Sequence, residues 1–371
     1  MLAFATFAAA MSGYFANMKN RFVWVALAGF MLGLGEAHAQ GADTTSTLSI
    51  VAVGDLMLGT NYPNSSYLPP EGGRLVLADV NDLLSSADLT FGNLEGVLMG
   101  AKGTVAKRCS DPAKCYAFKS PDDYVWHLER AGIDMVSLAN NHANDFGMEG
   151  KQNTMMLLDS AGIAYAGLDE FPSCVVERDG LRVGMTAFSP NRGSLQIADL
   201  AGVSRRVKEL KATCDMVIVS FHGGAEGIDH RHVRPGTEMY LGENRGDPML
   251  FARTAIDAGA DLVLGHGPHV PRAVDLYHDR FIIYSLGNFA TYGRFSLRGQ
   301  KGLAPILEIE LNRDGTFIRA KIHSAIQRGE GGPSLDPEQR ALHDIRGLTQ
   351  ADCPQSGLVF QEDGSILPPS H

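Results

Sequence analysis

The chain has 371 residues, of which 44% are hydrophobic and 20% are charged. This composition excludes a disordered, collagen-like or multi-span membrane protein, and it predicts one large or two modest globular domains with ample core. Lysine and arginine number 32 against 42 aspartates and glutamates, which gives a net charge of −10 at pH 7. An acidic surface repels phosphate backbones, so we expect no nucleic-acid partner.

The first 39 residues have the pattern of an export signal. A basic segment begins at Met18, an apolar run of fourteen residues extends to Gly35, and a small-x-small cleavage site ends at Ala39. As a helix this run would measure about 21 Å, which is shorter than a bilayer core of about 30 Å. We therefore expect a start at Met18, removal of residues 1–39 and a periplasmic or secreted chain without a stable membrane span. A retained anchor is the alternative.

All five cysteines lie in the expected mature part, and an oxidising compartment permits disulfides there. Cys109 and Cys115 bracket a turn-rich insert, and we expect them to form a disulfide. Two unpaired loop thiols are the alternative. Cys174, Cys214 and Cys353 leave one cysteine without a partner. The absence of Cys-x-x-Cys argues against a redox motif or a thiolate zinc site.

From Leu48 onward, short apolar runs alternate with segments of helical periodicity. The expected strands are Leu48–Val53, Leu89–Phe91, Met135–Leu138, Val183–Phe188, Val217–Ser220, Leu262–Leu264 and Phe281–Ser285. The expected helices are Arg74–Ser86, Pro121–Ala131, Gly150–Ala161, Leu195–Lys211 and Pro248–Ala258. Strands that are apolar throughout and alternate with helices predict an α/β fold with a mainly parallel sheet covered on both faces.

Towards the C-terminus the pattern changes. Leu303–Leu311 and Thr316–His323 flank an Asp-Gly turn and predict a hairpin. One helix over Pro337–Arg346 and an irregular tail follow. No linker separates two domains, so we expect one domain over residues 42–330 and a C-terminal appendage over residues 331–371.

A polar residue able to hold a metal or an oxyanion follows almost every expected strand. In chain order these residues are Asp55, Asn93, Glu95, Asn140, Asn141, His142, Asn191, His222, Glu226, His266, His269 and Asn288. The carboxyl ends of parallel strands meet at one edge of a sheet, so these side chains are expected to converge on one crevice. Carboxylates, amide oxygens and imidazoles without thiolate suit divalent cations. The sequence therefore predicts a metal site at this edge.

Each of these residues alone has a structural explanation. Asp55 is also typical of a turn or a helix cap, and His142 or His222 alone would fit a hydrogen-bonded structural histidine. The pair His266 and His269 is harder to explain structurally, because both lie on a tight glycine- and proline-framed loop. The chain lacks a phosphate-binding Gly-x-x-x-x-Gly-Lys loop, a Gly-x-Ser-x-Gly elbow and a His-Glu-x-x-His motif. The convergence of many such residues favours the metal site.

These motifs resemble the CapA/PgsA-like capsule-synthesis family, which is associated with poly-γ-glutamate capsules and is similar to the calcineurin-like metallophosphoesterases. The matching segments are Val53–Gly59, Asn93–Glu95, Ala139–Gly147, His222–Glu226, Gly265–Val270 and Tyr284–Phe289. The resemblance covers about residues 48–330. It implies a four-layer α/β/β/α sandwich of the metallophosphoesterase type and a dinuclear centre of divalent ions (Mn, Zn, Fe or Mg).

Carried over residue by residue, the resemblance implies a ligand set. Asp55 and His269 would hold one metal, Asn141, His222 and His266 the other, and Glu95 would bridge the two in place of the usual aspartate. Two positions depart from the pattern. Met57 stands where the wider superfamily has a histidine that binds the first metal, and Gly267 stands where the capsule family often has another histidine.

The resemblance also implies catalytic and substrate-binding roles. His142 would be a general acid or oxyanion stabiliser, with Asn140 beside it in the catalytic group. The expected substrate-binding residues are Asn93, Glu226, His230, Arg234 and Asn288. His230 and Arg234 belong to a basic stretch that would orient an anionic substrate, although a solvated loop explains that stretch equally well.

We therefore expect an exported, metal-dependent hydrolase that acts on an anionic envelope polymer or a phosphorylated envelope precursor, with membrane proteins of capsule synthesis as partners. The bond cleaved, a phosphoester or an amide, is left open. One alternative is a non-catalytic accessory that binds poly-γ-glutamate or another polymer for export and has a structural metal. Another is a periplasmic phosphatase for small phosphoesters.

Overall fold

The computed structural model describes residues 47–108, 116–328 and 332–370, which all belong to one compact unit. The expected signal segment and the expected disulfide between Cys109 and Cys115 lie outside these ranges, so both stay predictions. Among the described cysteines, Cys174, Cys214 and Cys353 are free thiols. No helix within the described ranges is long and apolar enough to cross a membrane.

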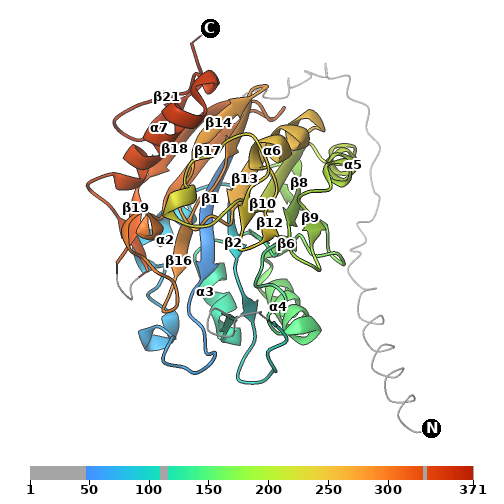
Figure 1. Ribbon diagram of the computed structural model, residues 1–371, viewed down its shortest axis with the longest axis vertical. Helices are drawn as coiled ribbons and strands as arrows, with labels where there is room; N and C mark the ends of the chain where they lie inside the picture. Colours follow the sequence, from blue (N-terminus) through green and yellow to red (C-terminus); the bar gives the residue numbers. More distant parts are fainter. Residues whose placement is uncertain (1–46, 109–115, 329–331, 371) are drawn as a thin grey trace, which may run out of the picture. The chain divides into compact units, whose positions relative to one another are not determined.

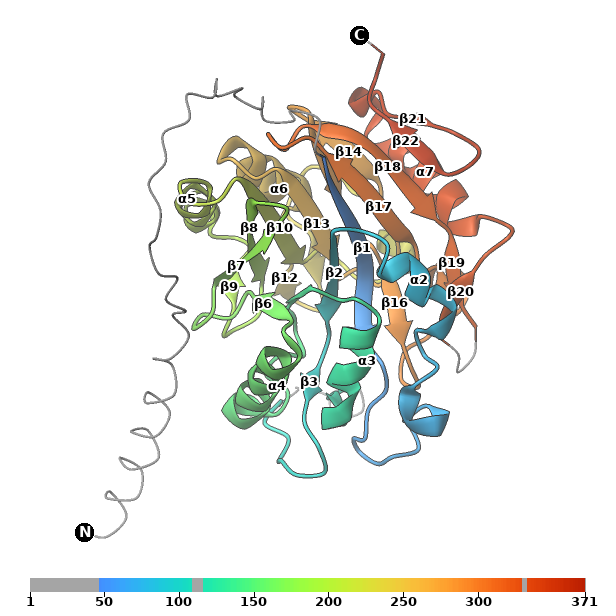
Figure 2. The same ribbon diagram turned by 180° about the vertical axis from the view of Figure 1, so that it is seen from behind.

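The first sheet has β1 near its centre (Figures 1 and 2). Its order is β21 (Val359–Phe360), β22 (Ser365–Leu367), β18 (Phe317–His323), β17 (Ile306–Leu311), β1 (Leu48–Met57), β2 (Leu89–Leu94), β5 (Met135–Ser137) and β6 (Ala164–Ala166), and β16 (Asn288–Thr291) also pairs with β1. Strands β1, β2, β5 and β6 are parallel, and the expected hairpin forms the antiparallel pair β17 and β18.

The second sheet has β10 and β13 at its centre. Its order is β14 (Val274–Tyr277), β15 (Arg280–Ile283), β13 (Leu262–His266), β10 (Met216–His222), β8 (Leu181–Ser189) and β7 (Ser173–Arg178), and β9 (Leu195–Gln196) pairs with β8. Strands β8, β10, β13 and β15 are parallel. The smaller pairs are β3 (Val97–Leu98) with β4 (Lys119–Ser120), β11 (Met239–Tyr240) with β12 (Glu243–Asn244), and β19 (Ala325–Gln327) with β20 (Pro333–Leu335).

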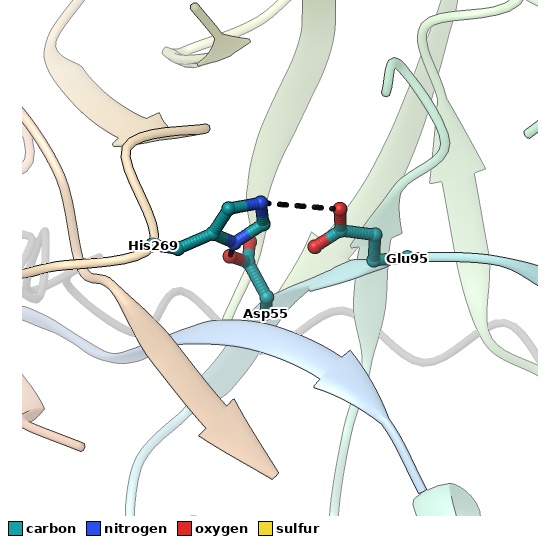
Figure 3. A group of neighbouring side chains, drawn as sticks. All are labelled: Asp55, Glu95 and His269. Atoms are coloured by element: carbon teal, nitrogen blue, oxygen red, sulfur yellow. Dashed lines mark hydrogen bonds and ion pairs between the residues drawn. The ribbon is translucent and has the colours of Figure 1, made fainter. Parts of the chain in front are cut away.

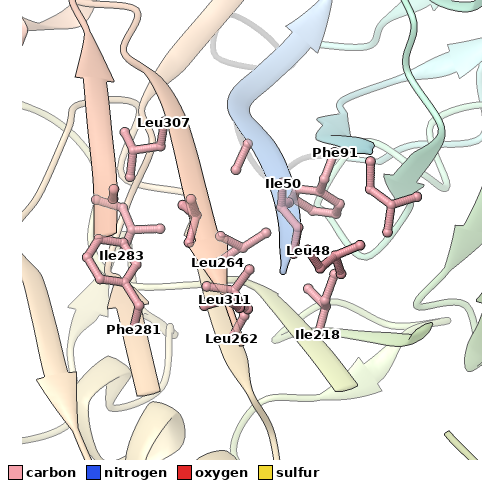
Figure 4. Packing of buried hydrophobic residues seen from close by; sticks show 14 of the residues in the cluster. Leu48, Ile50, Phe91, Ile218, Leu262, Leu264, Phe281, Ile283, Leu307 and Leu311 are labelled. Atoms are coloured by element: carbon pink, nitrogen blue, oxygen red, sulfur yellow. The ribbon is translucent and has the colours of Figure 1, made fainter. Parts of the chain in front are cut away.

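The two sheets pack face to face around the main core. Side chains such as Leu48 and Phe91 of the first sheet meet Ile218 and Leu264 of the second (Figure 4). Complete burial of one such side chain stabilises the fold by about 1.5–3 kcal/mol. Because both inner faces are apolar, the sandwich is the arrangement that removes them from water together.

Helices cover the two outer faces and complete four layers. The first sheet is covered by α2 (Asn81–Leu84), α3 (Val125–Arg130) and α4 (Gly147–Ala161). The second is covered by α5 (Leu200–Lys211) and α6 (Pro248–Asp257), which flank β8 and β10 in Figure 1. The expected α/β/β/α sandwich is therefore confirmed.

Three elements differ from the expectation. The segment 74–86 forms 3-10 turns and only the short α2, and α5 begins at Leu200 because the Asp199 carboxylate accepts the Gly202 N–H at 3.0 Å. The expected appendage is integrated into the fold: α7 (Arg340–Asp352) places Leu342 and Ile345 in the main core, and β22 extends the first sheet.

The polar strand ends come from both sheets and not from one. Asp55 and Glu95 belong to the first sheet or directly follow it, whereas His222 and His266 end neighbouring strands of the second sheet and lie opposite each other in register. After β15 the chain crosses from the second sheet to the first, where Asn288 pairs in register with Asp55. The site therefore lies where the same ends of both sheets meet.

Candidate metal centre

Asp55 lies at an irregular point of β1, where the register to both β2 and β16 shifts. The preceding Gly54 approaches the backbone of Gly287 so closely that a Cβ would lie 2.0 Å from its carbonyl oxygen. The Asp55 N–H donates to this same carbonyl at 2.9 Å. Only glycine fits at position 54, and this close approach fixes where the Asp55 carboxylate points.

Two buried carboxylates and one partly buried imidazole form the centre of the site (Figure 3). One ligand atom each of Asp55, Glu95 and His269 lies within 4.8 Å of the others. His269 Nδ1 is 3.0 Å from Asp55 Oδ2, and His269 Nε2 is 3.7 Å from Glu95 Oε1. The imidazole therefore lies between two carboxylates, which is where a positive charge is most strongly stabilised.

Three further side chains carry candidate ligand atoms that form no hydrogen bond within the described ranges. His222 Nε2, both ring nitrogens of His266, and Asn141 Oδ1 are buried without a hydrogen-bond partner among the described residues. His266 Nδ1 lies 3.4 Å from Asp55 Oδ1. Within the same described part of the chain, the two carboxylate oxygens of Glu95 are likewise buried and unpartnered. Unpartnered buried polar atoms are costly, so such a concentration requires a reason.

The electrostatics follow from burial and from the close approach of opposite charges. Burial raises the pKa of Glu95 well above its usual range. Burial and the Arg245 guanidinium lower the pKa of His222 well below its usual range. For His269, burial opposes the charged form, but the carboxylates of Glu95 and Asp55 raise the pKa to about 10. Burial would raise the pKa of Asp55, yet the adjacent imidazoles of His266 and His269 lower it.

The donor set fits divalent cations. It combines carboxylates, imidazoles and an amide oxygen, which suit metals such as Mn, Fe, Zn and Mg. Direct contacts link Asp55, Glu95, His266 and His269. The His222 ring lies 6.2 Å from that of His269, and Asn141 lines the same cleft as His269. The unpartnered atoms of Glu95, His222 and His266 are the observation that a bound cation would explain.

Three predicted asparagines hold the ligands in place. Asn93 Nδ2 donates to Asp55 Oδ1 at 2.8 Å, and Asn288 Oδ1 lies 3.1 Å from His269 Nδ1. Asn140 donates to Asn93 Oδ1 at 3.1 Å and accepts the His142 N–H at 3.0 Å. Because the amide of Asn140 is engaged on both sides, its contacts position Asn93 and His142. Such outer contacts orient the groups that bind metal.

His142 is oriented by two residues that we did not predict. Its Nδ1 lies 2.7 Å from Asp145 Oδ2, and its Nε2 faces Glu95 at 3.8 Å. Lys107 pairs with Asp145 Oδ1 at 3.1 Å and donates to the Asn141 carbonyl at 3.2 Å. Burial lowers the pKa of His142, while the Asp145 carboxylate opposes this shift. Asp145 follows His142 by three positions, and this spacing in the sequence could have identified the pair.

A cleft of about 760 Å³ opens above these residues and exposes Asn141, His142 and His269. Arg245, which we also did not predict, lies in its wall with only 2% of its side chain exposed. Its Nε donates to the Gly224 carbonyl at 3.0 Å, and its Nη2 lies 3.3 Å from Glu226 without a hydrogen-bond partner in the described ranges. The cleft thus presents a fixed, buried guanidinium beside the candidate metal ligands.

Aromatic rings cover the same cleft. The Phe118 ring lies 4.2 Å from His142 between ring centres, and it stacks on Phe295 at 5.0 Å. Phe295 also meets the edge of His269 at 5.5 Å. These rings reduce access of water to the imidazoles and leave the approach to the ligands through the polar side of the cleft.

Two predicted substrate-binding residues lie elsewhere. His230 and Arg234 line a separate cavity of about 530 Å³, and Tyr240, which meets the His230 ring at 6.1 Å, connects His230 to the main cleft. Glu226 lines the main cleft, as expected. Met57 is buried in β1 and pairs in register with Thr291.

Comparison with known proteins supports the resemblance. The sequence matches the family model for the bacterial capsule synthesis protein PGA_cap over residues 49–292. Capsule biosynthesis protein CapA of Bacillus anthracis is 27% identical over 308 residues, which cover 77% of this chain and 69% of that protein. PGA biosynthesis protein CapA of Bacillus subtilis (strain 168) is 26% identical over 285 residues, which cover 72% of this chain and 70% of that protein.

A third relative matches over a shorter stretch, and two solved structures align at lower sequence identity. A probable polyglutamine synthesis accessory protein of Mycobacterium tuberculosis is 28% identical over 230 residues, 55% of this chain and 56% of that protein. A hypothetical protein from Thermus thermophilus aligns with a TM-score of 0.46 and 18% identity over 76% of this chain and all of that one. A putative 5′-nucleotidase from Staphylococcus aureus aligns with a TM-score of 0.43 and 14% identity over 82% of this chain and 58% of that one. Because the family model matches well over half of the residues of this chain, the chain belongs to the PGA_cap family of bacterial capsule synthesis proteins.

Proposed function

We propose that the protein is an exported, divalent-metal-dependent hydrolase that acts on an anionic envelope polymer or its phosphorylated precursor. The observation that supports this most is the set of buried, unpartnered donors of Glu95, His222 and His266 beneath an accessible cleft. The role in capsule synthesis follows the family. The names of the Bacillus relatives refer to capsule and PGA biosynthesis, and this supports an anionic polymer as the substrate class.

The proposed centre comprises Asp55, Glu95, Asn141, His222, His266 and His269. When bound there, two divalent cations would activate water and stabilise negative charge on the substrate. Their identity is open among Mn, Zn, Fe and Mg, and the place of Met57 in β1 leaves the first site with one ligand fewer than in the wider superfamily.

The side chains of the cleft would perform the remaining steps. Arg245 is held by the Gly224 carbonyl and by ion pairs with Glu226 and Glu243, and its Nη2 forms no hydrogen bond with the described residues. It would therefore bind an anionic group of the substrate and align it over the centre. His142, oriented by Asp145, would donate a proton to the leaving group or stabilise the developing oxyanion. Phe118 and Phe295 would keep bulk water from these groups.

This proposal is tested by hydrolysis assays on the mature chain loaded in turn with Mn, Zn, Fe and Mg. The substrate panel contains phosphomonoesters, phosphodiesters and γ-glutamyl amides. Turnover of at least one class that disappears on chelation and returns on metal addition supports a hydrolase. A small phosphomonoester as the preferred substrate would favour a periplasmic phosphatase, the third function considered.

A non-catalytic role in polymer export is the second candidate. The name of the M. tuberculosis relative, an accessory protein, favours it, and so do the cations that border the cleft at Lys107, Arg245 and Lys301. In that case the centre would be structural. Substitution of His142 separates the two functions, because a structural centre does not need this side chain whereas hydrolysis does.

Export itself is tested at the N-terminus. We propose cleavage after Ala39, which predicts that the mature protein recovered from the periplasm or medium begins at Gln40. N-terminal sequencing gives the answer directly. Recovery of an uncleaved chain in the membrane fraction would instead support a retained anchor, and mass spectrometry of the same sample shows whether Cys109 and Cys115 are joined.

A further inference from the structure

A second cavity lies outside the metal centre, beside the segment 293–303. It has a volume of about 680 Å³ and is bounded by α7, by β19 and by the turn around η6 (Gly299–Gly302). None of the candidate metal ligands, all of which lie in the described ranges, lines it. Its size lies in the range of cavities that bind small molecules.

One part of the cavity wall is apolar. Leu297, Leu303 and Ile326 line it, and Leu303 is buried. Gly347 of α7 adds open space, since no atom of the described residues, apart from its own helix, lies within 4 Å of the position that its Cβ would occupy. A glycine inside a helix destabilises it relative to alanine, so this space is kept at the expense of helix stability.

The polar part of the wall is rich in arginine. Arg231, Arg328 and Arg340 line the cavity against one carboxylate, that of Asp344. Arg231 pairs with Asp344, whereas Arg340 pairs outside the lining with Asp336 at 2.6 Å and with Glu338 at 3.6 Å. The protein as a whole carries a net charge of −10, so a cavity with three arginines stands out from its acidic surroundings. Guanidinium groups bind carboxylates and phosphates.

We propose that this cavity binds a soluble amphiphilic anion, an aliphatic chain that ends in a phosphate or carboxylate group. The chain packs against Leu297, Leu303 and Ile326, with its end over Gly347. The anionic group lies near Arg328 and Arg340. This site goes beyond the proposed hydrolase function, because its ligand meets none of the groups assigned to the reaction.

The two cavities share one segment of chain. Leu297 and Gln300 face the second cavity, whereas Phe295 and Lys301 line the cleft over the metal centre. Phe295 in turn stacks on Phe118 and meets His269. A ligand in the second cavity therefore restrains the segment that covers the imidazoles, and amide hydrogen exchange of residues 293–303 reports on its binding without any assay of hydrolysis.

Isothermal titration of the mature chain with octyl phosphate tests the proposal. We expect one site per chain, slower amide exchange over residues 293–303, and affinity at least about tenfold higher than for inorganic phosphate or octyltrimethylammonium. Equal affinity for the cationic amphiphile would overturn the proposal. So would binding to phosphatidylglycerol vesicles without binding of monomeric octyl phosphate, because that result assigns the arginines to a membrane surface.

Variants locate the site. Gly347→Leu fills the open space and should weaken octyl phosphate binding at least about tenfold, whereas the matched variant Gly347→Ala should keep affinity within about threefold. Arg328→Gln, at an exposed position, should weaken binding severalfold and Arg328→Lys should restore it, which keeps the test valid if Gly347→Leu does not fold. Metal content should not change in any of the four. Wild-type affinity in both Gly347→Leu and Arg328→Gln would overturn the proposal.

Discussion

His142 and Asp145 form a buried pair, with His142 Nδ1 2.7 Å from Asp145 Oδ2 and His142 Nε2 directed towards Glu95. The carboxylate fixes the plane of the imidazole and leaves one ring nitrogen for the cleft. This arrangement is typical of a histidine that transfers a proton, and His142 lines the cleft.

His142→Ala should lower kcat for the preferred substrate by about 10²–10³, the range expected for loss of a general acid. Metal content should stay at the wild-type value, since His142 is not among the proposed ligands, whereas loss of its buried hydrogen bond to Asp145 should lower the unfolding temperature. Steady-state kinetics with elemental analysis of the same preparation measure both. His278→Ala, at an exposed position, is the control and should leave kcat unchanged. Full activity in His142→Ala would exclude hydrolysis through this residue.

Asp145→Asn keeps the size of the side chain but removes its charge. Asp145 also accepts the Phe118 N–H at 2.7 Å and pairs with Lys107, so we expect loss of about 1–3 kcal/mol of unfolding free energy. As a positioning residue it should affect kcat by about tenfold and leave KM near its wild-type value. Urea denaturation and kinetics test this. An effect on KM alone would contradict the assigned role.

Glu95→Gln should change stability in opposite directions with and without metal. Without metal, the substitution removes a buried carboxylate that forms no hydrogen bond with the described residues and has only long contacts with His142 and His269, and the unfolding free energy should rise by about 1–3 kcal/mol. With saturating metal the wild type gains about 2.7 kcal/mol at a concentration a hundred times Kd, and the variant gains less. Thermal melts of both proteins with chelator and with Mn²⁺ show whether the difference in stability between wild type and variant reverses. Parallel shifts in both conditions would show that Glu95 does not hold metal.

Arg245→Met should act mainly on substrate binding. Loss of a buried guanidinium that contacts an anion is expected to raise KM by about tenfold or more, with a smaller effect on kcat. Arg253→Met, at a partly exposed arginine of α6, is the control. If the two variants bind anionic substrates equally well, Arg245 serves only to hold the Gly224 carbonyl.

Gly54→Ala tests the backbone contact that places Asp55. A Cβ at this position cannot be accommodated 2.0 Å from the Gly287 oxygen, so the strand must move. We expect destabilisation by more than about 2 kcal/mol and loss of bound metal. Gly347→Ala, in open space within a helix, should instead stabilise by up to about 1 kcal/mol. Metal retention in a folded Gly54→Ala variant would contradict the role of this contact.

The sequence was sufficient for most of the strands, and it predicted that the polar residues after them would lie together. Apolar runs that are buried on both faces, such as those of β10 and β13, mark parallel strands, and the polar residues after them must lie at the same edge. That this edge belongs to two sheets followed only from the family resemblance and not from the pattern, because register and layering depend on contacts far apart in the chain. The segment 74–86 was misjudged because apolar residues three apart, such as Leu77 and Val80, also suit a 3-10 turn.

Other features of the site were missed because they depend on residues that lie far apart in the sequence. Arg245 lies 21 positions from Gly224, its hydrogen-bond acceptor, and no local pattern links the two. His230 and Arg234 formed a basic cluster in the sequence, yet the hairpin of β11 and β12 separates them from the main cleft. The helix α7 carries Leu342 and Ile345 at helical spacing, a signal that was recognised without showing that this face enters the main core.

Metal stoichiometry tests the central claim most directly. The purified mature chain, stripped with chelator, reconstituted in turn with Mn²⁺, Zn²⁺, Fe²⁺ and Mg²⁺ and freed of excess ion, is analysed for bound metal by mass spectrometry beside His266→Ala. The account predicts one to about two equivalents for at least one of the ions in the wild type and a marked loss in the variant, because His266 is a proposed ligand whose buried ring nitrogens form no hydrogen bond with the described residues. Less than about half an equivalent of every ion in the wild type, or equal content in the two proteins, would contradict it.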